Sequence, residues 1–166
     1  RHEQAVQAYE RAIALDKDDA AVWEHLGRSW VALNRFGKAL TAFETSARLK
    51  PDEARTYLRM GRVLAALRQT DKAIDVLKHA IRLLPDYVSA HIALGEIYRD
   101  AARYDEAVVE LKAALALSAK NSDALMALGM LHVKRGEKDA AYEVLRALQA
   151  VDTTRGAKLS DAIFRM

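Results

Sequence analysis

Residues 88–121, VSAHIALGEIYRDAARYDEAVVELKAALALSAKN, contain the pattern on which the whole chain is built. The pair Leu94-Gly95 lies in a stretch with apolar residues at three- and four-residue intervals, and Ala107 and Leu111 lie in a second such stretch. This spacing is typical of a helix that buries one stripe of its surface. The segment is therefore predicted to form two amphipathic helices.

The same pattern returns every 34 residues in strict phase. Short polar segments at 34–37, 68–71 and 135–138 separate the helices, so successive helices should be antiparallel neighbours. Small side chains let two helix backbones approach closely, and the recurring small residues are therefore predicted to be contact points between helices. They are the glycines Gly27, Gly61, Gly95 and Gly129, and the alanines Ala39, Ala73, Ala107 and Ala141, each followed four residues later by Phe43, Leu77, Leu111 or Leu145.

This pattern resembles the tetratricopeptide repeat family, in which an aromatic residue, Leu-Gly, Tyr, Ala, Phe and Pro recur at these spacings. Trp23, Tyr57 and Tyr98 match the aromatic places, and Pro51 and Pro85 close two of the units. The resemblance implies an all-α fold, an α-solenoid in which antiparallel helix hairpins stack into a right-handed superhelix. Departures from the pattern are Lys17, Ala119 and Thr153 for proline, Leu148 for a small residue, and His91 and His132 at packing places.

The register divides the chain into about four and a half units and a cap. Residues 1–19 match the second helix of a unit only, and full units are expected at 20–53, 54–87, 88–121 and 122–155. Residues 156–166 place Leu159, Ala162, Ile163 and Met166 on one helical face, which suits a C-terminal capping helix. Asp18, Asp52 and Asp86 precede the first helices of three units and are expected to cap them.

Composition limits the kinds of function. The formal net charge of +3 and the absence of dense Lys/Arg clusters argue against a nucleic-acid surface, as do the 34-residue phase and the lack of aromatic residues in the groove. No apolar stretch is long enough to cross a bilayer. A soluble chain is expected, cytoplasmic by default, with export as the alternative, because the lack of cysteine gives no indication of compartment.

Residues that carry enzyme chemistry do not occur in the required patterns. No two histidines stand four residues apart, as a helical metal site would need, and no phosphate-binding glycine loop or nucleophile motif is present. No catalytic residue, cofactor or metal site is predicted, and the chain is expected not to be an enzyme.

The resemblance implies that the concave wall of the superhelix binds a ligand through the outward-facing positions of the first helices. Four arginines gather in the first two units, with an apolar line beside them, so an acidic and apolar peptide or protein segment is the expected ligand. The alternative is that these arginines form only a solvated, ion-paired face. The expected groove residues are Glu24, Arg28, Arg55, Leu58, Arg59, Arg62, Ile92, Glu96, Arg99, Met126, Met130 and Lys134.

The predicted function is thus that of a protein-protein interaction scaffold, and two alternatives stay open. The apolar stripe of the N-terminal half unit, around Val6 and Tyr9, lacks a covering helix, so homo-oligomer formation through that face is one alternative. The chain starts within an amphipathic helix and without Met, which indicates a piece of a longer protein. The second alternative is therefore a recruiting arm of a larger enzyme.

Overall fold

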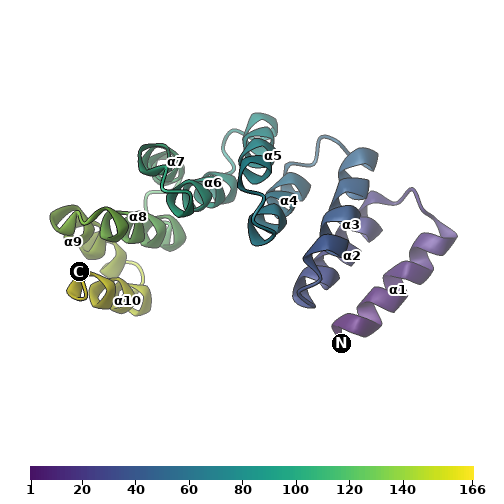
Figure 1. Ribbon diagram of the computed structural model, residues 1–166, viewed down its shortest axis with the longest axis horizontal. Coiled ribbons are helices and arrows are strands. Elements are labelled where there is room, and N and C mark those ends of the chain that lie inside the picture. Colours follow the sequence, from purple (N-terminus) through teal and green to yellow (C-terminus); the bar gives the residue numbers. More distant parts are fainter. The chain divides into compact units, whose positions relative to one another are not determined.

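The computed structural model describes residues 1–166, which form ten α-helices and no strand, as the sequence predicted (Figure 1). The chain divides into two compact units, Arg1–Pro85 with the first five helices and Asp86–Met166 with the last five. The helices are α1 (His2–Leu15), α2 (Ala20–Ala32), α3 (Phe36–Leu49), α4 (Ala54–Ala66), α5 (Thr70–Leu83), α6 (Val88–Asp100), α7 (Tyr104–Leu117), α8 (Ser122–Arg135), α9 (Lys138–Gln149) and α10 (Thr153–Phe164).

In the first unit, α2 pairs with α3 and α4 pairs with α5, and each hairpin packs against the preceding second helix. The core between α3 and α4 is built from Ala39, Phe43 and Ala47 on one side and Met60 and Val63 on the other. Because α3 contacts both α2 and α4, burial of its apolar stripe holds the two hairpins together.

In the second unit, α6 pairs with α7 and α8 pairs with α9, and α10 packs against both α8 and α9. Leu159 and Ile163 of α10 are fully buried in a cluster with Leu145 and Leu148 of α9. The terminal helix thus covers the last hairpin, and it begins at Thr153, three residues before the segment that the sequence pattern assigned to it.

The recurring glycines lie where two helices approach most closely. A Cβ added at Gly27 or Gly61 would lie 2.6 Å from an atom of Phe43 or Leu77, the large residue of the second helix in the same hairpin. Gly129 differs, because its nearest side chain is Leu159 of α10. At Gly129, the close contact is therefore made by the capping helix α10 and not by α9, the second helix of its own hairpin.

The prediction that Asp18, Asp52 and Asp86 cap the first helices is wrong. Each of these helices begins one residue later than a cap at those positions requires, so the capping position falls on the following residue. Asp19 caps α2 by accepting hydrogen bonds from the N–H groups of Ala21 and Val22. Glu53 before α4 and Tyr87 before α6 make no such bond, since neither has a short polar side chain.

The turns inside the hairpins are shorter than the polar segments indicated, because α3 already begins at Phe36 and α5 at Thr70. Each turn contains one residue with left-handed backbone, again 34 residues apart: Asn34 (φ 56°), Arg68 (φ 62°), Ala102 (φ 58°) and Gly136 (φ 74°). This conformation ends the first helix and lets the chain reverse direction.

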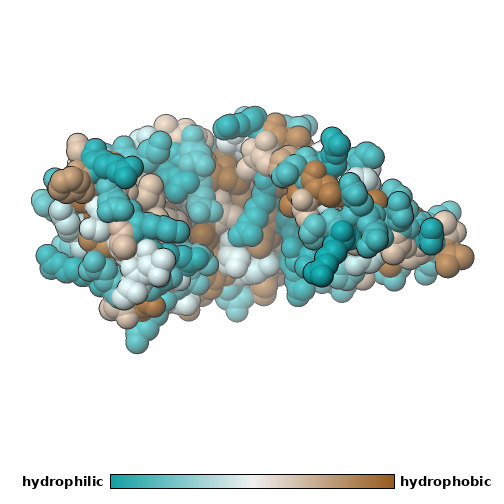
Figure 2. Space-filling view, turned by 90° about the horizontal axis from the view of Figure 1, so that it is seen from below, coloured by the Kyte–Doolittle hydropathy of each residue, from teal (hydrophilic) through white to brown (hydrophobic).

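The surface is predominantly hydrophilic, with apolar side chains in small groups, as Figure 2 shows for one face. No helix has both the length and the apolar character that crossing a membrane would require.

Two glycines provide a matched test of the helix contact. A Cβ at Gly95 would lie 2.7 Å from Leu111 Cγ, whereas Gly37, on the outside of α3, has no atom within 4 Å. Gly95→Leu is expected to lower the free energy of unfolding by about 1–3 kcal/mol through overpacking. Gly37→Leu should leave it unchanged or raise it by about 0.5–1 kcal/mol, because glycine is a poor helix former. Urea denaturation followed by circular dichroism measures both, and equal effects would contradict the proposed packing.

Candidate functional site

All six expected groove residues of the first unit lie on the facing helices α2 and α4. Glu24 on α2 and Arg59 on α4 form an ion pair between Oε1 and Nε, although the geometry is not that of a hydrogen bond. The side chains are 15% and 31% exposed, so the pair is partly desolvated, and removing one partner would leave the other charge uncompensated. This ion pair links two successive repeats.

An apolar pocket of about 310 Å³ lies next to Arg59. Its apolar lining comes from all three neighbouring helices, with Val31 from α2, Phe43 from α3 and Val63 from α4. The volume suits one apolar side chain of a ligand. We call this site the apolar pocket, and its lining residues are Arg28, Val31, Ala32, Phe36, Phe43, Arg59, Arg62 and Val63.

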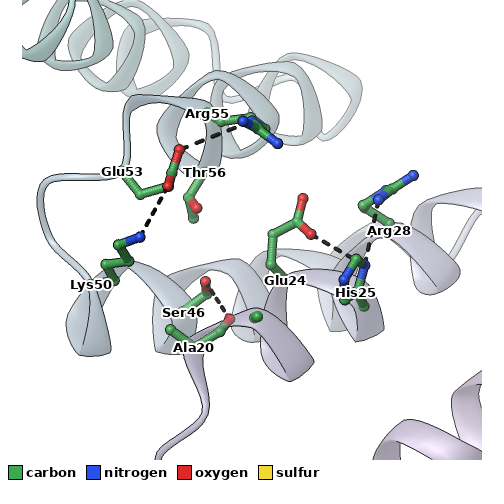
Figure 3. Close-up of a pocket in the computed structure, with 10 residues that line it drawn as sticks. Ala20, Glu24, His25, Arg28, Ser46, Lys50, Glu53, Arg55 and Thr56 are labelled. Atoms are coloured by element: carbon green, nitrogen blue, oxygen red, sulfur yellow. Dashed lines mark hydrogen bonds and ion pairs between the residues drawn. The ribbon is translucent and has the colours of Figure 1, made fainter.

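A second pocket, of about 210 Å³, includes Glu24 and is lined mostly by polar and charged residues (Figure 3). It lies where the start of α2, the end of α3 and the start of α4 meet. Arg28 lines both pockets. We call this second site the polar pocket, and its lining residues are Ala20, Ala21, Glu24, His25, Arg28, Ser46, Lys50, Glu53, Arg55 and Thr56.

The arginines of this region differ in how far their charge is compensated. Arg62 makes no ion pair or hydrogen bond, and the only polar partner of Arg28 is His25, with 3.4 Å between Nη1 and Nδ1. Arg55 is 65% exposed, and its Nε lies 4.0 Å from Glu53 Oε1. Two exposed guanidinium groups beside an apolar pocket are therefore free to meet a carboxylate.

The sequence pattern places Leu58 and Ile92 on the open wall, and the structure contradicts this. Their side chains are only 5% and 6% exposed. Leu58 and Ile92 occupy the register that Glu24 has in the first full repeat. Neighbouring residues cover the two apolar side chains, whereas the Glu24 side chain keeps partial access to solvent. Between α2 and α4, accessible apolar surface is found instead in the apolar pocket.

The remaining expected residues lie in the second unit, on α6 and α8, and have different surroundings. Arg99 is paired with Asp100, with 2.9 Å between Nε and Oδ1. Met126 and Met130 of α8 are partly buried against the cluster that contains Leu125. Lys134 lines an open polar cavity of about 630 Å³ with residues of the α6–α7 and α8–α9 turns. Glu96 completes this group, on α6.

His91 and His132, at packing positions, both make polar contacts. His91 is 8% exposed, and its Nδ1 lies 2.7 Å from Glu110 Oε2 on α7. His132 Nδ1 lies 2.7 Å from Glu137 Oε2 at the start of α9. In the α6–α7 hairpin and in the α8–α9 hairpin, a histidine therefore joins the two helices by a polar contact as well as by packing.

Glu137 is also bound by Arg135, with 2.7 Å from Nε to Oε1, and Arg135 Nη1 reaches Asp105 at 3.0 Å. An ionised carboxylate can only accept, so His132 donates from Nδ1. This hydrogen bond, with a smaller contribution from the charge of Arg135, lowers the pKa of Glu137 below its usual range. No three His, Asp or Glu side chains come together in a group that could hold a metal ion.

Sequence reasoning did not single out Ser46 and Thr56 of the polar pocket. The signal was available in the register, because the corresponding residues of other repeats are alanines. They are Ala80 and Ala114 for Ser46, and Ala90 and Ala124 for Thr56.

Two family models match the sequence. The one described as Tetratricopeptide repeat matches residues 98–161, and the one described as CABIN1 N-terminal domain matches residues 1–103. None of the curated proteins matches the sequence significantly.

Several solved structures have the same fold. TTC0263, a thermophilic tetratricopeptide repeat protein of Thermus thermophilus, is 25% identical with a TM-score of 0.82, over 99% of this chain and 91% of that one. PilW, a type IV pilus biogenesis factor, is 20% identical with a TM-score of 0.85, over 98% and 78%. YrrB, described as having an unusual peptide-binding site, is 22% identical with a TM-score of 0.77, over 96% and 84%.

The lowered pKa of Glu137 predicts a pH-dependent stability. A carboxyl group with a lowered folded-state pKa stabilises the fold fully above its unfolded-state pKa, and this contribution is lost as the pH falls through the folded-state pKa. Glu137→Gln should therefore be less stable than the parent at neutral pH, and the difference should vanish in acid. Urea denaturation at a series of pH values measures this, with Glu143→Gln, an exposed residue of α9, as the control. A difference that is constant with pH would contradict the assignment.

Proposed function

This chain belongs to the tetratricopeptide repeat family and, over residues 1–103, to the family of the CABIN1 N-terminal domain. On this basis we propose that the chain binds a segment of a partner protein between α2 and α4. The family makes the chain a protein-interaction scaffold. The observation that carries the proposal is the apolar pocket, which Arg28, Arg59 and Arg62 line together.

The ligand is a segment in which an apolar side chain stands next to a carboxylate. The apolar side chain enters the apolar pocket, where its burial contributes about 1.5–3 kcal/mol. The carboxylate meets Arg28 and Arg62, whose guanidinium groups have no carboxylate partner of their own. Arg59 is held by Glu24, so it stays in place and keeps the two helices at the spacing that the ligand needs.

Tetratricopeptide repeat scaffolds generally have no enzymatic activity, and we propose that this chain acts by holding a partner as well. The peptide-binding site in the description of YrrB supports a peptide ligand for this class of fold.

Charge reversal tests the proposed site. Arg28→Glu with Arg62→Glu should abolish binding of synthetic peptides that combine Asp or Glu with Leu or Phe, because the carboxylate would then meet two like charges. The melting temperature should hardly change, since neither arginine forms an ion pair with a carboxylate. Fluorescence anisotropy on a labelled peptide library measures binding.

The matched control is Arg11→Glu with Arg48→Glu, which reverses two exposed arginines outside both pockets. Ala32→Leu tests the site without a change of charge. It places a larger side chain in the apolar pocket, so it should weaken binding of the same peptides. If the Arg28/Arg62 variant binds them as well as the control does, the proposed site is wrong.

A second candidate function is self-association through α1. The α1 face with Ala8 and Tyr9 is exposed or half-buried, whereas the corresponding residues of α3, Ala42 and Phe43, are 2% and 1% exposed. In α3 this face is covered by α2, and Gly27 lies against Phe43. A second copy could cover the face on α1 in a similar way.

Sedimentation velocity at increasing concentration tests this candidate. Association is expected to raise the weight-average sedimentation coefficient, and Ala8→Arg should prevent the rise by placing a charge in the interface. A coefficient that does not depend on concentration would remove this candidate without affecting the peptide site.

A further inference from the structure

The polar pocket is unusually polar for its place in the repeat. Thr56 and Ser46 stand where two other repeats have alanine, and Glu24 stands at the register of Leu58 and Ile92. The hydroxyl of Ser46 donates to the carbonyl oxygen of Ala20 at 2.9 Å, so its hydrogen is already used. The hydroxyl of Thr56 donates no hydrogen bond within the protein.

Thr56 is 1% exposed, and its hydroxyl has no hydrogen-bond partner. Its side chain points from the first turn of α4 into the polar pocket, toward the space between Glu24 and Lys50 (Figure 3). The hydroxyl is not among the fully buried polar atoms of the chain, so solvent reaches it through the pocket although the rest of the residue is buried. Its orientation into a pocket indicates that a ligand can supply the missing bond.

The first turn of α4 adds backbone donors beside this hydroxyl. Glu53, the residue before the helix, makes no capping hydrogen bond with its side chain. The N–H of Thr56 donates to the carbonyl oxygen of Glu53 at 3.0 Å, so the N–H groups left for a ligand are those of Ala54 and Arg55. The positive end of the helix dipole lies at the same place, and both favour an anion.

The charges that line the pocket also favour an anion. The cations Arg28, Lys50 and Arg55 outnumber the two carboxylates. Glu24 is bound to Arg59, and its Oε2 lies 3.5 Å from His25 Nδ1. Glu53 holds Lys50 at 3.4 Å and Arg55 at 4.0 Å, but these cations are 58% and 65% exposed. Such exposed pairs are weak, so both cations can turn to a new anion at little cost.

We propose that the polar pocket binds an oxyanion, held by the Thr56 hydroxyl, the first turn of α4, Lys50 and Arg55. A phosphate monoester and a side-chain carboxylate share this chemistry. The inference rests on the proposed function in one respect, since the oxyanion is carried by the partner segment whose apolar side chain fills the apolar pocket.

Free anions test the pocket without a peptide. The full chain, labelled with ¹⁵N, is titrated with inorganic phosphate and separately with acetate, at constant ionic strength maintained with sodium chloride. Saturable shifts are expected at the amides of Arg55 and Thr56. Thr56→Ala should weaken binding about ten-fold, which is the effect of one hydrogen bond to a charged group. This variant should fold normally, because alanine occupies the same register at Ala90 and Ala124.

Thr41→Ala is the matched control, since this exposed threonine of α3 lies outside the pocket, and it should bind as the parent does. Tighter binding of phosphate than of acetate assigns a phosphate monoester, and comparable binding assigns a carboxylate. The inference is overturned if neither anion shifts these amides saturably, or if Thr56→Ala binds as tightly as the parent.

Arg62→Glu separates this inference from the proposed function, because Arg62 lines only the apolar pocket. The Arg62→Glu variant should bind the acidic-apolar peptides more weakly and should bind phosphate as the parent does. Peptide binding without an anion response would overturn the oxyanion site alone. An anion response without any peptide binding would overturn the proposed function alone.

Discussion

The contact of a glycine on a first helix with a large side chain on its partner is the constraint on which this structure depends. Gly27 against Phe43, Gly61 against Leu77 and Gly95 against Leu111 leave no room for even one methyl group. Because interiors are close-packed, this contact fixes how deeply the two helices of a hairpin nest. Successive hairpins with the same nesting present their first helices at the same register. The neighbouring positions of α2 and α4 in the first unit, and hence its two pockets, follow from this.

The two pockets would bind different parts of the ligand. The apolar pocket offers burial next to guanidinium groups, and the polar pocket offers a helix start with an unpaired hydroxyl. The Glu24–Arg59 ion pair connects their walls and joins one repeat to the next. A ligand that spans both pockets would contact two repeats together. Recognition would then depend on how the repeats stack as well as on single side chains.

The fold followed from the sequence because one spacing recurred four times, and glycine at a fixed period has few physical explanations. Details that depend on a single residue were harder to obtain. The sequence pattern predicts the helix starts one residue too early, so it indicates Asp18 as the cap that Asp19 provides. Leu58 was assigned to the open wall because helical periodicity gives a direction but not the neighbours that cover a side chain. The sequence shows that Thr56 stands at the register of Ala90, but only the structure shows that its hydroxyl faces the polar pocket without a protein partner.

The left-handed turns show how strongly packing governs local conformation here. The same backbone occurs at Asn34, Arg68, Ala102 and Gly136, although only glycine adopts it without steric cost and asparagine tolerates it better than alanine or arginine. Since the paired helices enforce the reversal, the identity of the residue at the bend matters little to the outcome. Four different residue types therefore occupy the bend in this chain, and each of these loops reverses the chain in the same way.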